Sequence, residues 1–354
     1  RPPVRFSYYK VPPSFCQFKL SLCISYPIPK LQGSDRKDLV KLTNSFLPEG
    51  RVLHTPENAA ACRDLEALTR AMAAEQILEG TALLSDENHD LLVRVGPFTG
   101  RIPREETALG IAEGVTRDIA ILARVGKPVA FVVDAIQDSP DGPSLLLSRR
   151  KAQEKALSHL LEQWIPGQVI PATVTHLEPF GAFVDVGCGV PSMIGVDRLS
   201  VSRIAHPRDR LQVGQDIYAA VLTLDRERRR VILTHRELLG TWEENAALFR
   251  PGMTVPGYVR GLKDYGAFVE LTANLSGLAE CKTGIREGDR VSVYIKSILP
   301  ERMKLKLLMI DLLPPTEGPE PNRYFITDGV MDRWSYAPAG CMKAGGETIF
   351  GEGK

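Results

Sequence analysis

The sequence predicts a mainly β protein in which tandem small β barrels are joined by short helices. The first observation is an internal repeat: residues 166–186 align with residues 251–271 at an offset of 85 positions, with nine of 21 pairs identical. Repetition of this kind reveals an architecture before any motif is read. The second is the character of each copy, in which β-branched and aromatic residues alternate with polar ones around a glycine. The third is a helical periodicity in the segments between the copies.

Composition limits the classes of function open to this chain. With 354 residues, 44% of them hydrophobic, it is long enough for about two to four domains. Its 44 basic and 43 acidic residues give a net charge of +1, so any nucleic-acid site must be local rather than a general cationic coat. Six cysteines without a CxxC pair indicate reduced thiols and a cytoplasmic location. No apolar run approaches ~18 residues, which argues against a membrane span.

The N-terminal part of the chain contains one predicted helix and one diverged barrel. Residues 1–48 are rich in proline and aromatic residues without a period, and we interpret them as a flexible extension. Within residues 49–75, Thr55 as N-cap and Pro56 at the first helical position begin a helix. Residues 76–150 have β character, and their closing pattern of alternating apolar residues matches the end of the two clear copies. This match predicts a third, degenerate copy of the repeat.

Two complete copies follow, each introduced by a helical connector. The connectors are residues 151–165 and 237–250, where leucines and aromatic residues recur at helical spacing before a Pro-Gly pair stops the helix. The copies span residues 166–236 and 251–310. Residues 311–354 are expected to form a linker and a C-terminal hairpin. The two expected strands of this hairpin are Arg323–Ile326 and Trp334–Tyr336.

The block aromatic-Gly-Ala-Phe recurs in both complete copies and supplies the candidate binding rings. These are Phe180 and Phe183 in one copy, and Tyr265 and Phe268 in the next. Residues i and i+3 of a regular strand face opposite ways, so we expect the intervening glycine to introduce a bulge that re-aims one ring. Two interpretations are open, since the rings belong either to the core or to an exposed surface. Exposed rings on a barrel stack on the bases of single strands with little sequence preference.

Basic residues accompany these rings in the sequence. The first complete copy has four arginines in its last predicted hairpin and four in the loop before it: Arg226, Arg228, Arg229 and Arg230, and Arg198, Arg203, Arg208 and Arg210. The second copy has a thinner set: Lys263, Arg302 and Lys304. A basic run alone is usually a solvated turn. Next to paired rings, we interpret these side chains as phosphate contacts.

Together these features resemble the RNA-binding repeat of ribosomal protein S1, and the layout is similar to that of divergent S1-like bacterial proteins. The resemblance is carried by PGQVIPATVTHLEPFGAFVDV, SMIGVDRLS and VGQDIYAAVLTLDRERRRVILTHRE. It recurs in PGMTVPGYVRGLKDYGAFVEL, SGLAE and EGDRVSVYIKSILPERMKLKL. The resemblance implies that each copy is a five-stranded OB-fold barrel.

The resemblance also implies which residues contact RNA. In this family the RNA face uses the two motif aromatics, a histidine in the third strand, and an Asp and an Arg near the fourth and fifth strands. The corresponding residues here are Phe180, Phe183, Tyr265, Phe268, and Asp225 with Arg229 or Arg230. The histidine is missing, because Gly195 and Glu280 stand at its position and Pro103 replaces it in the degenerate copy. We therefore expect the three copies to differ in how they bind.

No motif for catalysis is present in the sequence. The six histidines have no nucleophile or carboxylate partner at a fixed spacing, and P-loop, dinucleotide and zinc-protease signatures are absent. We expect no enzyme activity, no cofactor and no metal site. The leading hypothesis is a monomeric, cytoplasmic RNA-binding protein that holds single-stranded mRNA and acts with the small ribosomal subunit in translation. The alternatives are a protein-interaction adapter, and an accessory factor in RNA processing or transcription.

Overall fold

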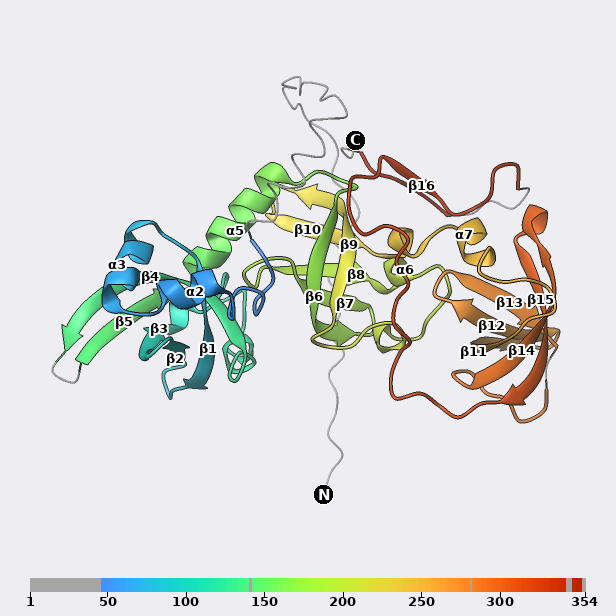
Figure 1. Cartoon of the computed structure of the whole chain (residues 1–354), viewed down its shortest axis with the longest axis horizontal. Helices are drawn as coiled ribbons and strands as arrows, with labels where there is room; N and C mark the ends of the chain where they lie inside the picture. Colours follow the sequence, from blue (N-terminus) through green and yellow to red (C-terminus); the bar gives the residue numbers. More distant parts are fainter. Residues whose placement is uncertain (1–45, 140–141, 281, 342–345, 352–354) are drawn as a thin grey trace.

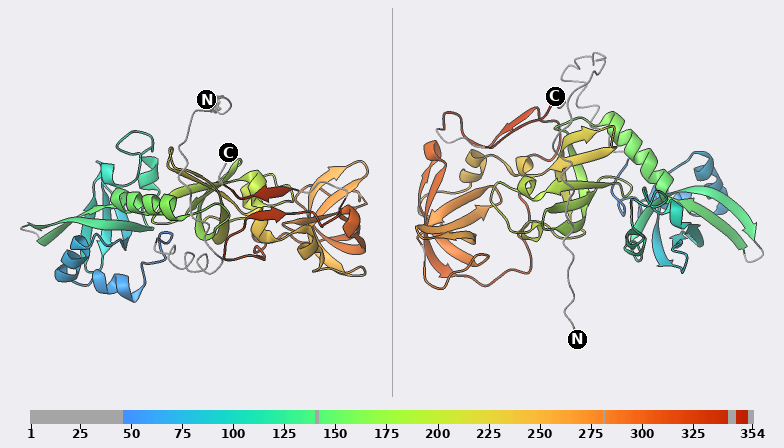
Figure 2. Two further views of the ribbon diagram at one scale, coloured as in Figure 1. Left: turned by 90° about the horizontal axis from the view of Figure 1, so that it is seen from above. Right: turned by 180° about the vertical axis from the view of Figure 1, so that it is seen from behind.

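Three closed, five-stranded β barrels follow one another along the chain (Figure 1). This computed structural model describes residues 46–139, 142–280, 282–341 and 346–351, so most of the predicted N-terminal extension (residues 1–48) lies outside the described residues. The barrels form a row when the molecule is seen from above and from behind (Figure 2). The prediction of a mainly β fold, with five-stranded OB-fold barrels joined by short helices, is confirmed. Within these ranges, no helix has both the length and the apolar character needed to cross a bilayer.

All three barrels share one strand order. The first strand pairs with the second and the fourth, and the third strand runs parallel to the fifth. Barrel one contains β1 (Leu78–Ser85), β2 (Leu91–Val95), β3 (Phe98–Ile102), β4 (Pro128–Ser139) and β5 (Gly142–Ser148). Barrel two contains β6 (Val169–Glu178), β7 (Gly181–Asp185), β8 (Pro191–Gly195), β9 (Asp216–Asp225) and β10 (Arg230–Thr234). Barrel three contains β11 (Thr254–Lys263), β12 (Gly266–Thr272), β13 (Leu275–Ala279), β14 (Arg290–Leu299) and β15 (Lys304–Leu312).

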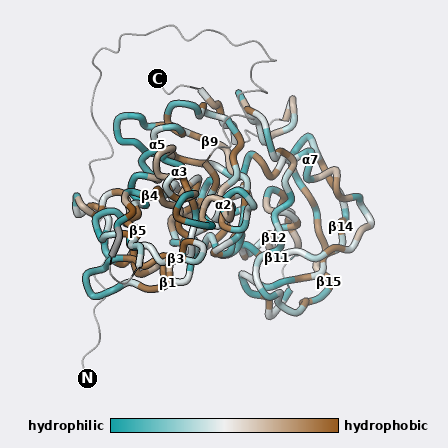
Figure 3. The backbone as a smooth tube through the Cα atoms, turned by 60° about the vertical axis from the view of Figure 1, so that its left-hand side comes forward, coloured by the Kyte–Doolittle hydropathy of each residue, from teal (hydrophilic) through white to brown (hydrophobic). Residues whose placement is uncertain are grey.

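Alternation along the strands separates each barrel core from its outer surface. In barrel two, Val174, Val184 and Ile194 are buried and point inward, while their neighbours along each strand face outward. In Figure 3 hydrophobic and hydrophilic stretches accordingly alternate along the backbone. Each barrel therefore has its own apolar core, and the outward positions remain free to form a binding surface.

The helix expected before barrel one is two helices in the structure. Thr55 caps α2 (Pro56–Ala61) as predicted, but the chain then breaks. Asp64 starts α3 (Leu65–Ala73), because its side chain accepts a hydrogen bond from the Ala67 amide. The sequence predicts one helix because the apolar residues continue at helical spacing through this second cap. The two helices pack over the barrel-one core.

Helix α5 (Arg149–Gln163) joins barrel one to barrel two. Ser148 caps it through a hydrogen bond from the Lys151 amide. Its leucines and Trp164 are buried in the same apolar cluster as the barrel-two core. The connector is therefore an extension of barrel two rather than a free spacer.

The second connector is shorter and broken. Gly240, with φ of 83°, separates the 3-10 helix η4 (Arg236–Leu239) from α7 (Trp242–Ala246), where one helix was expected. A Cβ at Gly240 would lie 2.6 Å from the ring of Phe325, so the close approach also requires glycine. The other short helices within the described residues are α4 (Ile119–Leu122), α6 (Val196–Leu199), η2 (Arg104–Glu106), η3 (Pro207–Asp209) and η5 (Pro300–Arg302).

Residues 313–341 and 346–351, here called the C-terminal strap, return from barrel three to barrel two (Figure 1). The hairpin predicted from Arg323–Ile326 and Trp334–Tyr336 is wrong, because β16 (Arg333–Ser335) pairs instead with β17 (Glu347–Ile349). Residues 323–326 instead lie against barrel two and the connector, where the Phe325 amide donates to the Leu238 carbonyl. The strap therefore ties the two barrels together.

One contact of the strap is a buried histidine–tyrosine pair. His235 is fully buried, with Nδ1 2.8 Å from the Leu199 carbonyl and Nε2 2.9 Å from the Tyr324 hydroxyl. The carbonyl can only accept, so Nδ1 carries the proton and Nε2 accepts from Tyr324. Burial lowers the pKa of His235 to about 4. The ring is therefore held neutral at the point where the strap docks.

A buried ion cluster joins barrel one to barrel two. Glu49 lies 2.6 Å from Arg149 and 3.2 Å from Arg124, and its own amide donates to Asp185 at 2.7 Å. Burial alone would raise the pKa of Glu49, but the charges of Arg149 and Arg124 and the hydrogen bonds from Arg149 and the Ala130 amide together outweigh it, so the pKa is lowered. Burial and the neighbouring charge of Glu49 raise the pKa of Asp185 to about 7.

A second ion cluster joins barrel two to barrel three. Both oxygens of Glu270 accept from the Arg210 guanidinium, and Arg260 Nε donates to Oε2 at 3.0 Å. The side chains of Arg210 and Glu270 are each only 5% exposed. Arg210 was predicted to hold phosphate, and this assignment is wrong, because tertiary packing buries it in a bidentate ion pair.

Candidate nucleic-acid interface

The two rings of barrel two lie together on its outer surface. Phe180 stands in the turn between β6 and β7 and is 56% exposed, while Phe183 lies half-buried on the outer face of β7. Their centroids are 5.9 Å apart with an interplanar angle of 89°. This edge-to-face geometry fixes both rings while leaving Phe180 free to stack on a base.

The glycine between the rings has a different role from the one expected. We predicted a bulge at the glycine, but the register shift in this hairpin lies in the partner strand, between Val174 and His176. A Cβ at Gly181 would lie 2.5 Å from the Ile194 carbonyl oxygen. A Cβ at Gly266 would meet the Ala279 carbonyl oxygen at 2.6 Å. Glycine is therefore required by close approach of the next strand.

The barrel-two face extends beyond the two predicted rings. Phe183 pairs with Met193 across β7 and β8, and Met193 pairs with Ile232 across β8 and β10. Ile232 is 41% exposed, and the His176 ring lies 6.3 Å from Phe183. Sequence reasoning missed these three neighbours, although alternation in β8 and β10 places Met193 and Ile232 outward. We call Phe180, Phe183, Met193 and Ile232 platform two.

Only some of the predicted arginines of barrel two remain at this surface. Arg230 is exposed two residues before Ile232 on the same outer face of β10. The Arg228 amide donates to Asp225, whose carboxylate therefore shapes the β9–β10 turn. Arg229 instead donates to Glu154 at 2.6 Å and to Ser158 at 3.0 Å, both on α5. Arg226 likewise donates to the Leu161 carbonyl of α5, so both arginines contact this helix while remaining exposed.

The predicted loop arginines of barrel two also lie in different surroundings. Helix α6 starts beside the rings, because the Val196 amide donates to the Phe180 carbonyl at 2.9 Å. Arg198 lies on this helix two residues after Val196, and it is half-buried, 3.5 Å from Asp197. Arg203 is exposed but lines a separate cleft beside Trp334 of the C-terminal strap.

Barrel three presents an equivalent surface with more positive charge. Tyr265 is 69% exposed, Phe268 is 38% exposed, and their centroids lie 6.3 Å apart at 86°. Phe268 pairs with Leu278, which in turn pairs with Lys306 of β15. Lys304 and Lys306 both face outward from β15 and are exposed. We call Tyr265, Phe268, Leu278, Lys304 and Lys306 platform three, of which Leu278 and Lys306 were not predicted.

The other predicted cations of barrel three lie at its periphery. Lys263 is exposed at the end of β11, where it pairs with Gly266 next to Tyr265. Arg302 is exposed in η5, immediately before β15. Glu280, at the position of the missing histidine, accepts from Lys296 at 3.1 Å. This ion pair reduces the repulsion that Glu280 alone would exert on a phosphate.

Barrel one has no ring pair at the equivalent position. The hairpin registers place Leu92 where barrel two has Phe183, and Leu84 where it has His176. Leu92 pairs with Arg101, whose Nη1 donates to Asp90 at 2.9 Å. An ion pair and aliphatic side chains thus replace the stacking surface.

Comparison with known proteins agrees with this geometry. Residues 165–236 match the family model for the S1 RNA binding domain. The chain is 32% identical over 205 residues to small ribosomal subunit protein bS1 of Leuconostoc lactis, covering 53% of this chain and 48% of that protein. It is 28% identical over 203 residues to the bS1 homolog of Bacillus subtilis strain 168, covering 53% and 52%. The chain therefore spans about half the length of these curated relatives.

A solved structure also aligns with much of the chain. It is a multidomain protein with nucleic acid binding domains from Streptococcus pneumoniae TIGR4, and it covers 66% of this chain and 73% of its own. Its sequence identity is 16% and the TM-score is 0.24. Residues 165–236 are therefore identified as an S1 RNA binding domain, and the repeated strand order and the bS1 relatives support a likeness of the longer chain to S1-type proteins.

Proposed function

We propose that this protein binds single-stranded RNA through platforms two and three. The observation that carries the proposal is the pair of exposed, edge-to-face rings at the same place in both barrels. Every base has a π face, so such rings stack on a single strand without reading its sequence. Base–aromatic stacking contributes about 1–3 kcal/mol per base.

The cations beside the rings support a phosphate backbone running over the same surfaces. Arg230 lies on the outer face of barrel two, and Lys304 and Lys306 lie on that of barrel three. A chain with a net charge of +1 thus concentrates its binding charge locally. The same surfaces hold no arrangement that suggests catalysis, so we propose a binding protein rather than an enzyme.

We further propose that the RNA is mRNA and that the protein acts with the small ribosomal subunit in the cytoplasm. This step is supported by the relatives, which are named small ribosomal subunit proteins bS1. A monomer is the simplest state, because all three barrels are already joined within one chain.

Two experiments test these proposals in sequence. Fluorescence anisotropy with a labelled 20-nucleotide single-stranded RNA tests binding by the purified chain. Saturable binding that depends on platforms two and three supports RNA binding, and its absence would place a protein-interaction adapter first. Co-sedimentation with purified ribosomal subunits then tests the ribosomal role. RNA binding without co-sedimentation would favour an accessory factor in RNA processing or transcription.

A further inference from the structure

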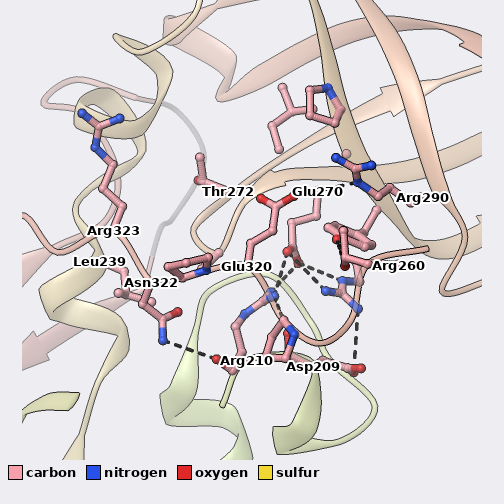
Figure 4. A pocket seen from close by; sticks show the side chains of 18 of the residues that line it. Asp209, Arg210, Leu239, Arg260, Glu270, Thr272, Arg290, Glu320, Asn322 and Arg323 are labelled. Carbon is pink, nitrogen blue, oxygen red and sulfur yellow. Dashed lines mark hydrogen bonds and ion pairs between the residues drawn. The ribbon is translucent and has the colours of Figure 1, made fainter. Parts of the chain in front are cut away.

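A cleft of about 610 Å³ lies between barrel two, barrel three and the C-terminal strap. Figure 4 shows side chains from all three parts converging on it. Five arginines and three carboxylates line the cleft: Arg208, Arg210, Arg260, Arg290 and Arg323, with Asp209, Glu270 and Glu320. The cleft is therefore positively charged, whereas the chain as a whole is nearly neutral.

Two of the arginines form the wall of the cleft. Arg210 and Arg260 both bind Glu270, and Arg260 also lies 3.8 Å from Asp209. These pairs are largely buried and hold the two barrels together. The two guanidinium groups neutralise the carboxylate of Glu270, so this carboxylate does not repel an anion that enters the cleft.

The other three arginines have unused hydrogen-bonding capacity. Within the described ranges, the side chains of Arg208 and Arg323 make no ion pair or hydrogen bond, and both residues are exposed. Arg290 Nε is buried without a hydrogen-bond partner, and its nearest carboxylate, on Glu320, lies 4.0 Å away. A buried guanidinium N–H without a partner costs free energy that a bound anion would recover. Guanidinium groups match phosphate geometry particularly well.

The cleft continues the outer surface of platform three. Phe268 and Glu270 are two residues apart on the same face of β12, roughly 7 Å along the strand. Phe268 is exposed, while Glu270 is covered by the barrel-two loop that carries Arg208 and Arg210. An RNA strand that stacks on Phe268 therefore reaches the opening of the cleft with its next nucleotide.

We propose that this cleft binds the phosphate backbone of the RNA strand where it leaves platform three. The inference rests on the proposed RNA binding and adds a route between the barrels. Arg208 and Arg323 make the outer phosphate contacts, and Arg290 makes the inner one. The strand is thereby directed along the junction of barrels two and three, and it bridges them.

The test compares two double variants that each remove two positive charges. Arg208→Gln with Arg323→Gln alters the cleft, and Arg63→Gln with Arg94→Gln alters exposed arginines near and on barrel one. Each variant is titrated with a labelled 20-nucleotide RNA and a labelled six-nucleotide RNA at several salt concentrations. Circular dichroism checks the fold, and neither cleft side chain makes a hydrogen bond or ion pair within the described residues.

We expect the cleft variant to bind the 20-nucleotide RNA about tenfold more weakly than the control variant. The magnitude of its slope of log K against log salt should be about 1.4 smaller than that of the wild type. The reason is that each single-strand phosphate contact contributes about 0.7 to this magnitude. Binding of the six-nucleotide RNA should change much less, because that length is within the site of one barrel, ~4–16 nucleotides.

Equal binding of the 20-nucleotide RNA by both double variants would overturn the inference while leaving the proposed RNA binding intact. A wild-type protein that binds neither RNA would overturn both. Adenosine monophosphate is titrated separately to distinguish a free nucleotide from a strand. If the wild type binds this nucleotide, the cleft variant does not, and both bind RNA equally well, the cleft binds a small ligand. That result would reject the route of the RNA strand through the cleft.

Discussion

Asp185 and Glu270 occupy the same position in consecutive barrels, and each is buried against the part of the chain that precedes its own barrel. Each follows a platform ring, Phe183 or Phe268, by two residues on the outer face of its strand. Asp185 accepts the Glu49 amide, and Glu270 binds Arg210. The repeat thus uses one acidic position to end each platform and to dock the preceding unit.

We first predict that Glu270→Ala destabilises the junction of barrels two and three by about 3–5 kcal/mol. The reason is that truncation leaves the buried guanidinium of Arg210 without its partner. Glu280→Ala provides the matched control, because Glu280 is 78% exposed and its pair with Lys296 should contribute less than about 1 kcal/mol. Urea unfolding of both variants measures the difference. Equal losses of stability would contradict a structural role for the Glu270 pair.

The second prediction concerns pH. Burial lowers the pKa of His235 to about 4 from 6.5, so the unfolded chain takes up this proton at a higher pH than the folded chain. The free energy of unfolding must therefore fall as the pH drops from about 6.5 towards 4. From these values we expect this group to cost about 2 kcal/mol at pH 5 relative to pH 7.5.

His235→Asn isolates that contribution, because it keeps a donor for the Leu199 carbonyl and does not titrate. Urea unfolding of wild type and variant at both pH values gives two stability losses. The wild type should lose about 2 kcal/mol more than the variant. Other titrating groups, such as Glu79 with its raised pKa, cancel in this comparison. An identical loss in both proteins would show that His235 is not held neutral.

The third prediction separates two adjacent arginines. Arg230 lies on the outer face beside platform two, whereas Arg229 donates to Glu154 and Ser158 on α5. Arg230→Ala should lower the slope of log K against log salt by about 0.7 for single-stranded RNA. Arg229→Ala should leave the slope unchanged and lower stability by about 0.2–1 kcal/mol. RNA titrations at several salt concentrations test both, and a reversed pattern would reject the assignment.

The repeated barrels could be predicted from the sequence because they depend on local sequence patterns. The 85-residue offset and the period-2 alternation are independent of tertiary contacts. The partners of the basic residues could not be predicted in the same way. Arg229 and Arg230 are neighbours in the sequence, yet one contacts a helix and the other faces solvent. The predicted strand pairing of the C-terminal hairpin was wrong for a related reason, because residues Arg323–Ile326 form hydrogen bonds with other elements.

The last prediction tests the platforms themselves. Phe180→Ala with Phe183→Ala should weaken binding of single-stranded RNA by about 2–5 kcal/mol, allowing for non-additivity between neighbouring rings. Tyr265→Ala with Phe268→Ala should weaken it in the same way, because both pairs have the same edge-to-face geometry. Anisotropy titrations measure both. Leu92→Ala on barrel one is the matched control and should leave RNA affinity unchanged.

Exposure distinguishes this result from a loss of folding. Phe180 is 56% exposed and Tyr265 is 69% exposed, so truncating either should cost far less than the about 3–5 kcal/mol expected for a buried phenylalanine. Single Phe180→Ala and Tyr265→Ala variants should therefore keep the wild-type unfolding midpoint and still bind RNA more weakly. Variants that unfold would mean that the rings are core residues. Folded double variants that bind RNA as tightly as wild type would remove the platforms from the binding surface and favour a protein-interaction adapter.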